Sequence, residues 1–155
     1  MATTIPATEV DEQKALVRRI IDEVFLKGDF AAVDDLMTDD FVSHTSGPGA
    51  SGKDGMKQAI TRVSGGLSDA SMTIEDMIAE DDRVAVRLTG HAVQTGEFMG
   101  MPPSGRAYTI GEIHIFRIRD GRVAEHWHQA DFLGMMRQLG AMTEMGGKPS
   151  ADGGR

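Results

Sequence analysis

The sequence predicts an α+β fold, in which a curved antiparallel sheet packs on N-terminal helices and encloses one apolar pocket. Two patterns indicate this fold class. Apolar residues recur at helical spacing as far as Gly66, and they alternate with polar residues between about residues 71 and 129. The length of 155 residues suits a single domain, which we expect over residues 8–140, with flexible ends at 1–7 and 141–155.

Three helices are predicted ahead of the sheet. The first is the clearest, because Leu16, Ile20 and Val24 lie one turn apart and charged residues occupy the opposite side. The predicted helical ranges are 8–27, 30–37 and 53–63. A brief strand at 41–44 and a loop at 45–52, rich in Gly, Ser and Pro, are predicted between the second and third helices.

Four longer strands are predicted where the apolar period changes to two. Their ranges are 72–79, 84–95, 108–119 and 122–129. The dipeptide Asp120-Gly121 is a strong signal for a hairpin between the last two strands. Residues 96–105 contain two prolines and three glycines and are predicted to form a loop. Asp131 is well placed to cap a final helix.

The composition excludes several classes of function. The absence of cysteine rules out disulfides, thiolate catalysis and sulfur-ligated zinc sites. The 24 acidic and 16 basic residues give a net charge of −8, which argues against a nucleic-acid partner. No apolar run approaches the ~18 residues of a membrane span, and the first ten residues lack the features of a signal peptide. We therefore expect a cytoplasmic protein that binds neither nucleic acid nor membrane.

Four side chains on the last two predicted strands stand out chemically: Glu112, His114, His126 and His128. A two-residue hairpin loop would pair Ile113 with His128 and turn His114 to the opposite face. A three-residue loop, with Gly121 left-handed in a bulge, would pair His114 with His126. It would also pair Glu112 with His128, so that all four side chains share one face. Such a face would suit acid/base chemistry or a His/Glu metal site.

Three segments carry a resemblance to a known family. They read GEFMGMPPSGR at 96–106, FRIRDGRVAEHW at 116–127 and DFLGMMRQLG at 131–140. Over roughly residues 10–140 the chain resembles the SnoaL-like polyketide cyclases, which have the cone-shaped NTF2-like, ketosteroid-isomerase-like fold. The resemblance implies an intramolecular aldol condensation of a polycyclic aromatic polyketide in antibiotic biosynthesis. It also implies that no metal or other cofactor takes part, and it favours the register that gathers the four side chains.

The resemblance further implies roles for these side chains. In the founding cyclases an aspartate on the last strand moves the proton, beside a histidine on the preceding strand. His114 matches that histidine, but His128 stands where the aspartate is expected. Since an imidazole titrates near neutral pH, His128 is the candidate general base and acid, with His114 and Glu112 orienting it and hydrogen-bonding the substrate. The alternatives are an isomerase, hydratase or hydroxylase-like enzyme of this fold, or a non-catalytic binding domain.

Eight further residues are candidates for contact with the substrate: Phe25, Ser43, His44, Ala59, Met99, Met101, His126 and Asp131. Phe25 and Ala59 match positions that shape the cavity in the family, and Ser43 matches a polar residue of its pocket. His44 is expected at the mouth of the pocket, and Met99 and Met101 are expected to form an adaptable lid. Asp131 either caps the last helix or stands in for the missing pocket aspartate.

The favoured register also turns several apolar side chains to the outer face of the sheet: Ile113, Ile115, Val123 and Trp127. Proteins of this fold family usually cover that face with a second subunit. The resemblance therefore implies a homodimer, with larger homo-oligomers left open. The expected partners are a second copy of the chain and an apolar or polycyclic small molecule.

Overall fold

The computed structural model describes residues 6–44 and 51–142, and it confirms the α+β class. The strands are β1 (Met37–Ser43), β2 (Leu67–Glu80), β3 (Arg83–Gln94), β4 (Ala107–Arg119) and β5 (Arg122–Ala130). The helices are α1 (Ala7–Arg19), the π-helix η1 (Ile20–Leu26), α2 (Phe30–Leu36), α3 (Lys53–Gly66) and α4 (Phe132–Gln138). The predicted flexible ends and the predicted loop at 45–52 lie largely outside the described residues.

One edge of the sheet departs from the predicted antiparallel pattern. The five strands follow the order β1-β5-β4-β3-β2, and β2 to β5 pair antiparallel in chain order. β1 instead pairs in parallel with β5, which brings Ser43 opposite His126. The sheet is therefore mixed, because β5 returns beside β1 in the same direction after the intervening helix and three strands.

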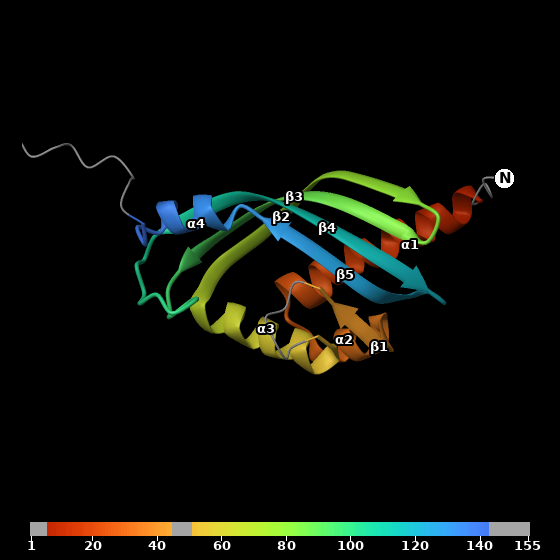
Figure 1. The fold of residues 1–155 in the computed structure, drawn as a ribbon, viewed down its shortest axis with the longest axis horizontal. Coiled ribbons are helices and arrows are strands. Elements are labelled where there is room, and N and C mark those ends of the chain that lie inside the picture. The colour runs from red at the N-terminus through yellow and green to blue at the C-terminus, as the bar shows by residue number, and fades with distance from the viewer. Residues whose placement is uncertain (1–5, 45–50, 143–155) are drawn as a thin grey trace, which may run out of the picture.

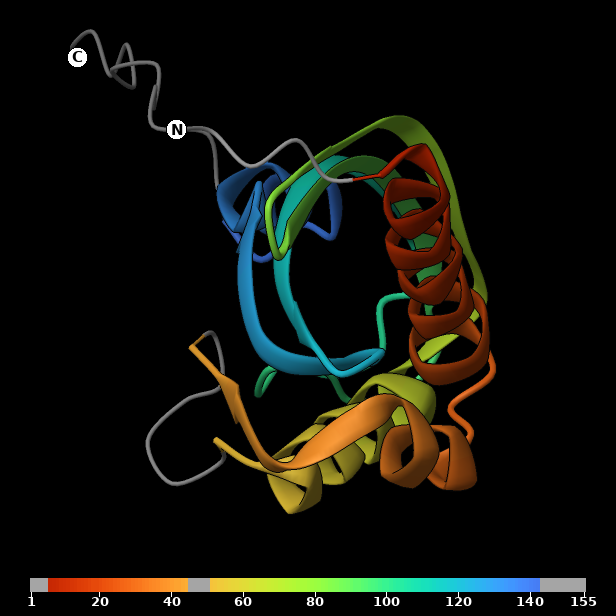
Figure 2. The ribbon, with the colours of Figure 1, turned by 90° about the vertical axis from the view of Figure 1, so that its right-hand side faces the viewer.

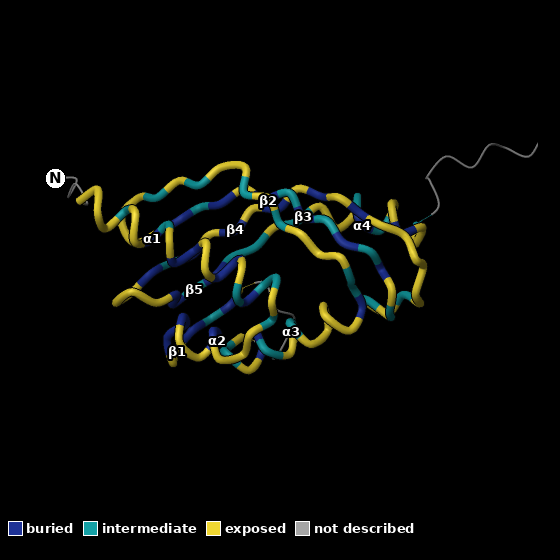
Figure 3. Tube along the Cα trace, turned by 180° about the vertical axis from the view of Figure 1, so that it is seen from behind, coloured by how far each residue is buried: buried dark blue, intermediate teal, exposed yellow. Residues whose placement is uncertain are grey.

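Figures 1 and 2 show the sheet curving around an interior, with α1 along one side and α2, α3 and β1 across another. Two apolar clusters occupy this interior. The larger joins α1, η1 and α2 to the sheet, and the smaller packs Tyr108 and Ile110 beneath α4. Buried and exposed residues alternate along β4 (Figure 3), and Glu112 and His114 lie on its buried face between the two clusters.

The first predicted helix is two helices in the structure. α1 ends at Arg19, and the chain continues as a π-helix, in which the N–H of Lys27 donates to the carbonyl of Asp22 at 3.0 Å. The turns of a π-helix are wider than α-helical turns and are frequent at functional sites. η1 carries Phe25 toward the histidines of β4 and β5. None of the described helices is long and apolar enough to cross a membrane.

The β4–β5 hairpin corrects the predicted loop. Asp120 (φ 52°) and Gly121 (φ 72°) are both left-handed, as in a two-residue hairpin turn, so the expected bulge at Gly121 is wrong. The bulge lies further along, with Ala124 as its extra residue. Because one extra residue reverses the facing of every later side chain, this bulge restores the shared face that a two-residue loop alone would abolish.

The bulge therefore confirms the predicted grouping and corrects the predicted pairs. Four side chains face the interior together, as predicted: Glu112, His114, His126 and His128. His114, however, lies opposite His128 and not opposite His126, and Glu112 lies opposite Ala130. β5 is thus displaced by two residues from the predicted register.

The predicted loop at 96–105 is anchored by a side chain that the sequence analysis did not single out. Gln94 is buried at the end of β3, and its Nε2 donates to the carbonyl oxygens of Met101 (3.3 Å) and Pro102 (3.1 Å). Its Oε1 accepts a hydrogen bond from Ser104 at 2.7 Å. Met101 packs on the smaller apolar cluster, whereas Met99 at the loop tip is largely exposed.

Candidate functional site

Four side chains on the inner face of β4 and β5 form one continuous chain of hydrogen bonds. The Nε2 atom of His126 lies 2.9 Å from Nδ1 of His114, and Nε2 of His114 lies 3.2 Å from Oε2 of Glu112. The same carboxylate oxygen lies 2.9 Å from Nε2 of His128. Because of the observed register, all three bonds join residues that are not directly opposite each other on the strands. We refer to these four residues as the His/Glu cluster.

Burial and hydrogen bonding fix the protonation states at the centre of the cluster. Burial alone would raise the pKa of Glu112, but hydrogen bonds with His114 and His128 outweigh it and lower this pKa to about 2. Burial lowers the pKa of His114, and it holds the pKa of His126 well below 6.5. Near neutral pH, Glu112 is therefore a carboxylate and both buried imidazoles are uncharged.

His128 is the most accessible member of the cluster. Its side chain is 20% exposed, whereas those of Glu112 and His114 are 9% and 3% exposed. The ring stacks on His114 at 4.1 Å and meets the edge of the exposed Phe132 at 6.1 Å. Its Nε2 bonds to Glu112, and no described residue forms a hydrogen bond with its Nδ1. Nδ1 of His128 is therefore the ring nitrogen of the cluster's most exposed side chain that is left for a ligand.

Aromatic rings close the opposite end of the cluster. Phe25 packs against His114 at 5.4 Å and against His126 at 5.7 Å, and Phe116 stacks on His126 at 4.8 Å. Phe25, predicted to shape the cavity, thus covers the rear of the cluster. Ser43, predicted as a polar residue of the pocket, is buried beside His126 across the β1–β5 pair.

The structure changes the roles expected of His114 and Glu112. Both ring nitrogens of His114 are engaged by protein groups, and Oε2 of Glu112 already meets two imidazoles. Neither ring nitrogen of His114 is left for a substrate oxygen. The two residues lie behind His128, where they can orient it but not replace it as the first contact.

His44 lies on the outer face of the sheet, so its predicted place at the pocket mouth is wrong. Its ring stacks on Trp127 at 4.8 Å, and its Nε2 lies 3.2 Å from Glu125. The reason is the alternation of a strand: because Ser43 points inward, its neighbour points outward. Trp127 accordingly faces away from the cluster, as predicted. The same prediction for Val123 is wrong, because Val123 precedes the bulge and is fully buried in the larger apolar cluster.

The remaining predicted contacts are spread over three elements. Asp131 caps α4, since its Oδ1 accepts the N–H of Gly134 at 2.8 Å, which is the first of its two predicted roles. Ala59 is half-buried on α3. Met101 and Met99 belong to the anchored loop near α4, and the lid expected of them stays a prediction.

Two residues that contact or flank the cluster, Gly90 and Tyr108, were not predicted from the sequence. A Cβ atom at Gly90 on β3 would overlap Oε1 of Glu112, so only glycine leaves room for the carboxylate. An isolated glycine inside an alternating strand was the available signal.

Tyr108 precedes the cluster on the same face of β4. Burial, aided by the charge of Glu112, raises the pKa of Tyr108 to about 12, which keeps its hydroxyl protonated.

A metal ion is the other ligand that these residue types can hold. In the described part of the chain, one group of ligand atoms converges closely, with atoms of Glu112, His114 and His128 within 4.8 Å of one another. Two nitrogens and a carboxylate oxygen would suit zinc or iron. Both nitrogens, however, lie at hydrogen-bond distance from the same oxygen. The geometry of the cluster is therefore that of a proton-bonded network.

Two hollows on the surface lie away from the cluster. One, of about 480 Å³, is lined by Thr38, Asp39, Asp40 and the β4–β5 turn, and the other, of about 970 Å³, lies between α1 and the same turn. Neither is lined by a residue of the His/Glu cluster. The first is lined by charged and polar side chains alone, whereas the second also has an apolar lining that includes Leu16 and Ile118.

The curved sheet, the helices that close it and the inward-facing acid/base cluster define an NTF2-like protein. The model of the SnoaL-like polyketide cyclase family matches residues 15–139, and the chain belongs to this family. The structure is similar to that of TsrD from Streptomyces laurentii, with a TM-score of 0.74 and 32% identity over 90% of this chain and 100% of that one. It is also similar to wild-type IdmH from Streptomyces antibioticus, with a TM-score of 0.72 and 28% identity over 83% and 98% of the chains.

Curated relatives match over shorter stretches. Aklanonic acid methyl ester cyclase DnrD from Streptomyces peucetius is 39% identical over 57 residues, which are 37% of this chain and 39% of that protein. Nogalonic acid methyl ester cyclase from Streptomyces nogalater is 42% identical over 45 residues, which are 29% and 34% of the two chains. The matched stretches thus span about two fifths or less of these relatives' lengths.

Proposed function

We propose that the protein is a polyketide cyclase that closes a ring in the methyl ester of a polycyclic aromatic polyketide acid, by an intramolecular aldol reaction without a cofactor. Family membership and two relatives named as methyl ester cyclases support the substrate class. His128 is the general base and acid. The observation that carries this assignment is the contact of its Nε2 with Glu112, which leaves Nδ1 of this partly exposed side chain without a hydrogen-bond partner among the described residues.

The proton balance of the reaction follows from this geometry. Nδ1 of His128 takes a proton from a carbon between two carbonyl groups, and His128 becomes an imidazolium that the carboxylate of Glu112 stabilises. The carbanion, delocalised as an enolate, attacks the second carbonyl carbon and forms the new carbon–carbon bond. The carbonyl oxygen becomes an alkoxide and recovers the proton from Nδ1. No electron acceptor is required, since the substrate and product are isomers.

Ring closure with aklanonic acid methyl ester and nogalonic acid methyl ester as substrates tests this proposal. We expect cyclised product from the wild type and a loss of kcat by about 10²–10⁴-fold in His128→Ala, the usual contribution of a general base. His91→Ala is the matched control, because His91 lies on the outer side of β3 and bonds to Thr109. Absence of product with every aromatic polyketide ester, or full activity in His128→Ala, would contradict the proposal.

We also propose that the outer face of the sheet joins two copies of the chain. Ile113 and Ile115 are 51% and 37% exposed there, beside the ring of Trp127. Exposed apolar side chains grouped on one face are typical of an interface between subunits. Light scattering at micromolar concentration should give the mass of a dimer, and Ile113→Lys should give the mass of a monomer.

A further inference from the structure

We infer that His126 and His114 form a hydrogen-bond relay with one fixed direction, which holds the carboxylate of Glu112 in place and thereby fixes the tautomer of His128. The two histidines are positioning residues in this account, because neither reaches the substrate. The inference rests on the proposed function only for its kinetic consequence. The relay itself is a property of the free protein.

The direction of the relay follows from the shared oxygen. Oε2 of Glu112 lies at hydrogen-bond distance from Nε2 of both His114 and His128. A carboxylate oxygen carries no hydrogen and has lone pairs for two donors. Both Nε2 atoms therefore carry the hydrogen and donate to Oε2. This arrangement excludes the opposite direction, in which Glu112 would donate to His114.

The donation from His114 determines the state of the next ring. A neutral imidazole has one N–H, so Nδ1 of His114 is an acceptor. The contact of 2.9 Å with His126 must then be a donation from Nε2 of His126. Nδ1 of His126 is left with a bare lone pair, and this buried nitrogen has no hydrogen-bond partner among the described residues. The relay thus begins at a lone pair and ends at a carboxylate.

The packing around the relay prevents the rings from turning. Phe25 covers both His114 and His126, and Phe116 stacks on His126 with an interplanar angle of 15°. His114 is held between Glu112 and His126 by both of its nitrogens. A ring flip of either histidine would therefore break a buried hydrogen bond, and the unsatisfied group would remain without water.

The relay explains why Glu112 can set the tautomer of His128. With Oε2 held by His114, the carboxylate presents the same oxygen to His128, whose Nε2 then keeps its hydrogen and whose Nδ1 stays available as a base. Without the donor on His126, Nδ1 of His114 is unpaired, and His114 loses the contact that fixes its ring. Oε2 of Glu112 then loses a donor of fixed position, and His128 populates both tautomers.

Nitrogen-15 NMR of protein labelled at histidine tests the relay without a substrate. The wild type should show Nε2 protonated and Nδ1 bare in His114, His126 and His128 near neutral pH. In His126→Leu, which removes the donor, His128 should show a mixture of tautomers. His126→Gln keeps an N–H donor and should retain the wild-type tautomer of His128. A wild-type protein with hydrogen on Nδ1 of His114 would overturn the inference, even if no variant folds.

Kinetics then separate the relay from the proposed function. In His126→Leu we expect kcat to fall by roughly 10- to 100-fold, the effect of one lost buried hydrogen bond, with KM changed by less than about twofold. His126→Gln should recover most of the loss, and His91→Ala should behave as the wild type. Unchanged kcat and an unchanged His128 tautomer in a folded His126→Leu would overturn the inference. A relay seen by NMR in a protein without cyclase activity would reject the proposed function alone.

Discussion

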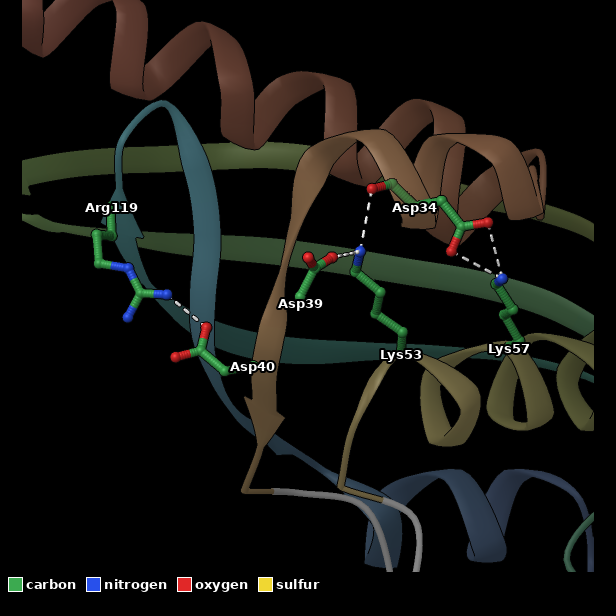
Figure 4. A network of polar contacts seen from close by, with 6 residues as sticks. All are labelled: Asp34, Asp39, Asp40, Lys53, Lys57 and Arg119. Atoms are coloured by element: carbon green, nitrogen blue, oxygen red, sulfur yellow. Dashed lines mark hydrogen bonds and ion pairs between the residues drawn. The ribbon is translucent and has the colours of Figure 1, made fainter.

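Two polar networks in this protein are built around carboxylates, one at the exposed surface and the other in the buried interior. In the exposed network, Lys53 meets Asp39 at 2.9 Å and Lys57 meets Asp34 at 2.8 Å, so that α3 is tied to β1 and α2 (Figure 4). The side chain of Asp39 is 97% exposed, and water competes for every bond. In the His/Glu cluster the carboxylate of Glu112 is 9% exposed. Burial therefore distinguishes the two networks more than the number of bonds does.

The two networks reach the same carboxylate pKa by different routes. The exposed network also contains the pair Arg119 and Asp40 (Figure 4), in which the hydrogen bond and charge of Arg119 lower the pKa of Asp40 to about 2. Glu112 also has a pKa of about 2, but it opposes burial and relies on two imidazole partners. The first carboxylate can exchange its partner for water at little cost, whereas the second cannot. Only the second provides a fixed geometry for chemistry.

The largest effect is expected from crowding the buried network. Gly90→Ala puts a methyl group where Oε1 of Glu112 lies, so the carboxylate must move away from His128. A displacement of this size in an active site reduces kcat by about 100-fold. Gly111→Ala is the matched control on the neighbouring strand, because its methyl group would meet nothing within 4 Å. Equal kcat values in the two variants would show that the position of Glu112 does not matter.

A smaller effect is expected from acid. Burial lowers the pKa of His114 and His126, so they stay neutral when folded, whereas they take up protons near pH 6.5 when unfolded. The unfolded state then binds more protons, and the free energy of unfolding falls below about pH 6.5, by up to ~1.4 kcal/mol per pH unit for each ring.

Urea unfolding at about pH 7.5 and about pH 5.5 measures this loss. His126→Gln should remove the larger part of it, because burial lowers the pKa of His126 further than that of His114. The exposed network should contribute nothing in this range, since Asp40 is ionised in the folded and unfolded states alike. Equal stability at the two pH values would mean that the buried rings are not held neutral.

The smallest effect is expected from the exposed network. Lys57→Ala removes both contacts with Asp34, which are made at 2.8 and 2.9 Å. Because exposed ion pairs add little to stability, we expect the Tm to change by less than about 2 °C and kcat to stay the same. A larger fall in Tm, measured by calorimetry, would show that the two networks are less different than their exposure indicates.

The sequence predicted most of the fold, because periodicity and turn residues encode it locally. It gave the helices, the four long strands and the hairpin at Asp120-Gly121. It missed the π-helix, since a change from 3.6 residues per turn to a wider turn does not alter the apolar periodicity clearly over seven residues. It also missed the parallel pairing of β1, which depends on contacts between distant segments.

The candidate site was predicted in composition but not in connectivity. The four cluster residues were identified, and their common face was expected. Their hydrogen bonds were not, because the bulge at Ala124 displaces β5 by two residues from the expected register. The role of Gly90 could not be predicted from the sequence pattern, since it depends on where one carboxylate oxygen of Glu112 lies in space.

The central claim is that Nδ1 of His128 moves the proton, and chemical rescue tests it most directly. In His128→Ala the imidazole is missing, while Glu112, His114 and His126 remain to hold a replacement. We predict that ring closure by this variant is nearly abolished and rises with added imidazole in proportion to its neutral form. Wild-type activity in His128→Ala without imidazole would contradict the claim, as would a variant that imidazole fails to restore.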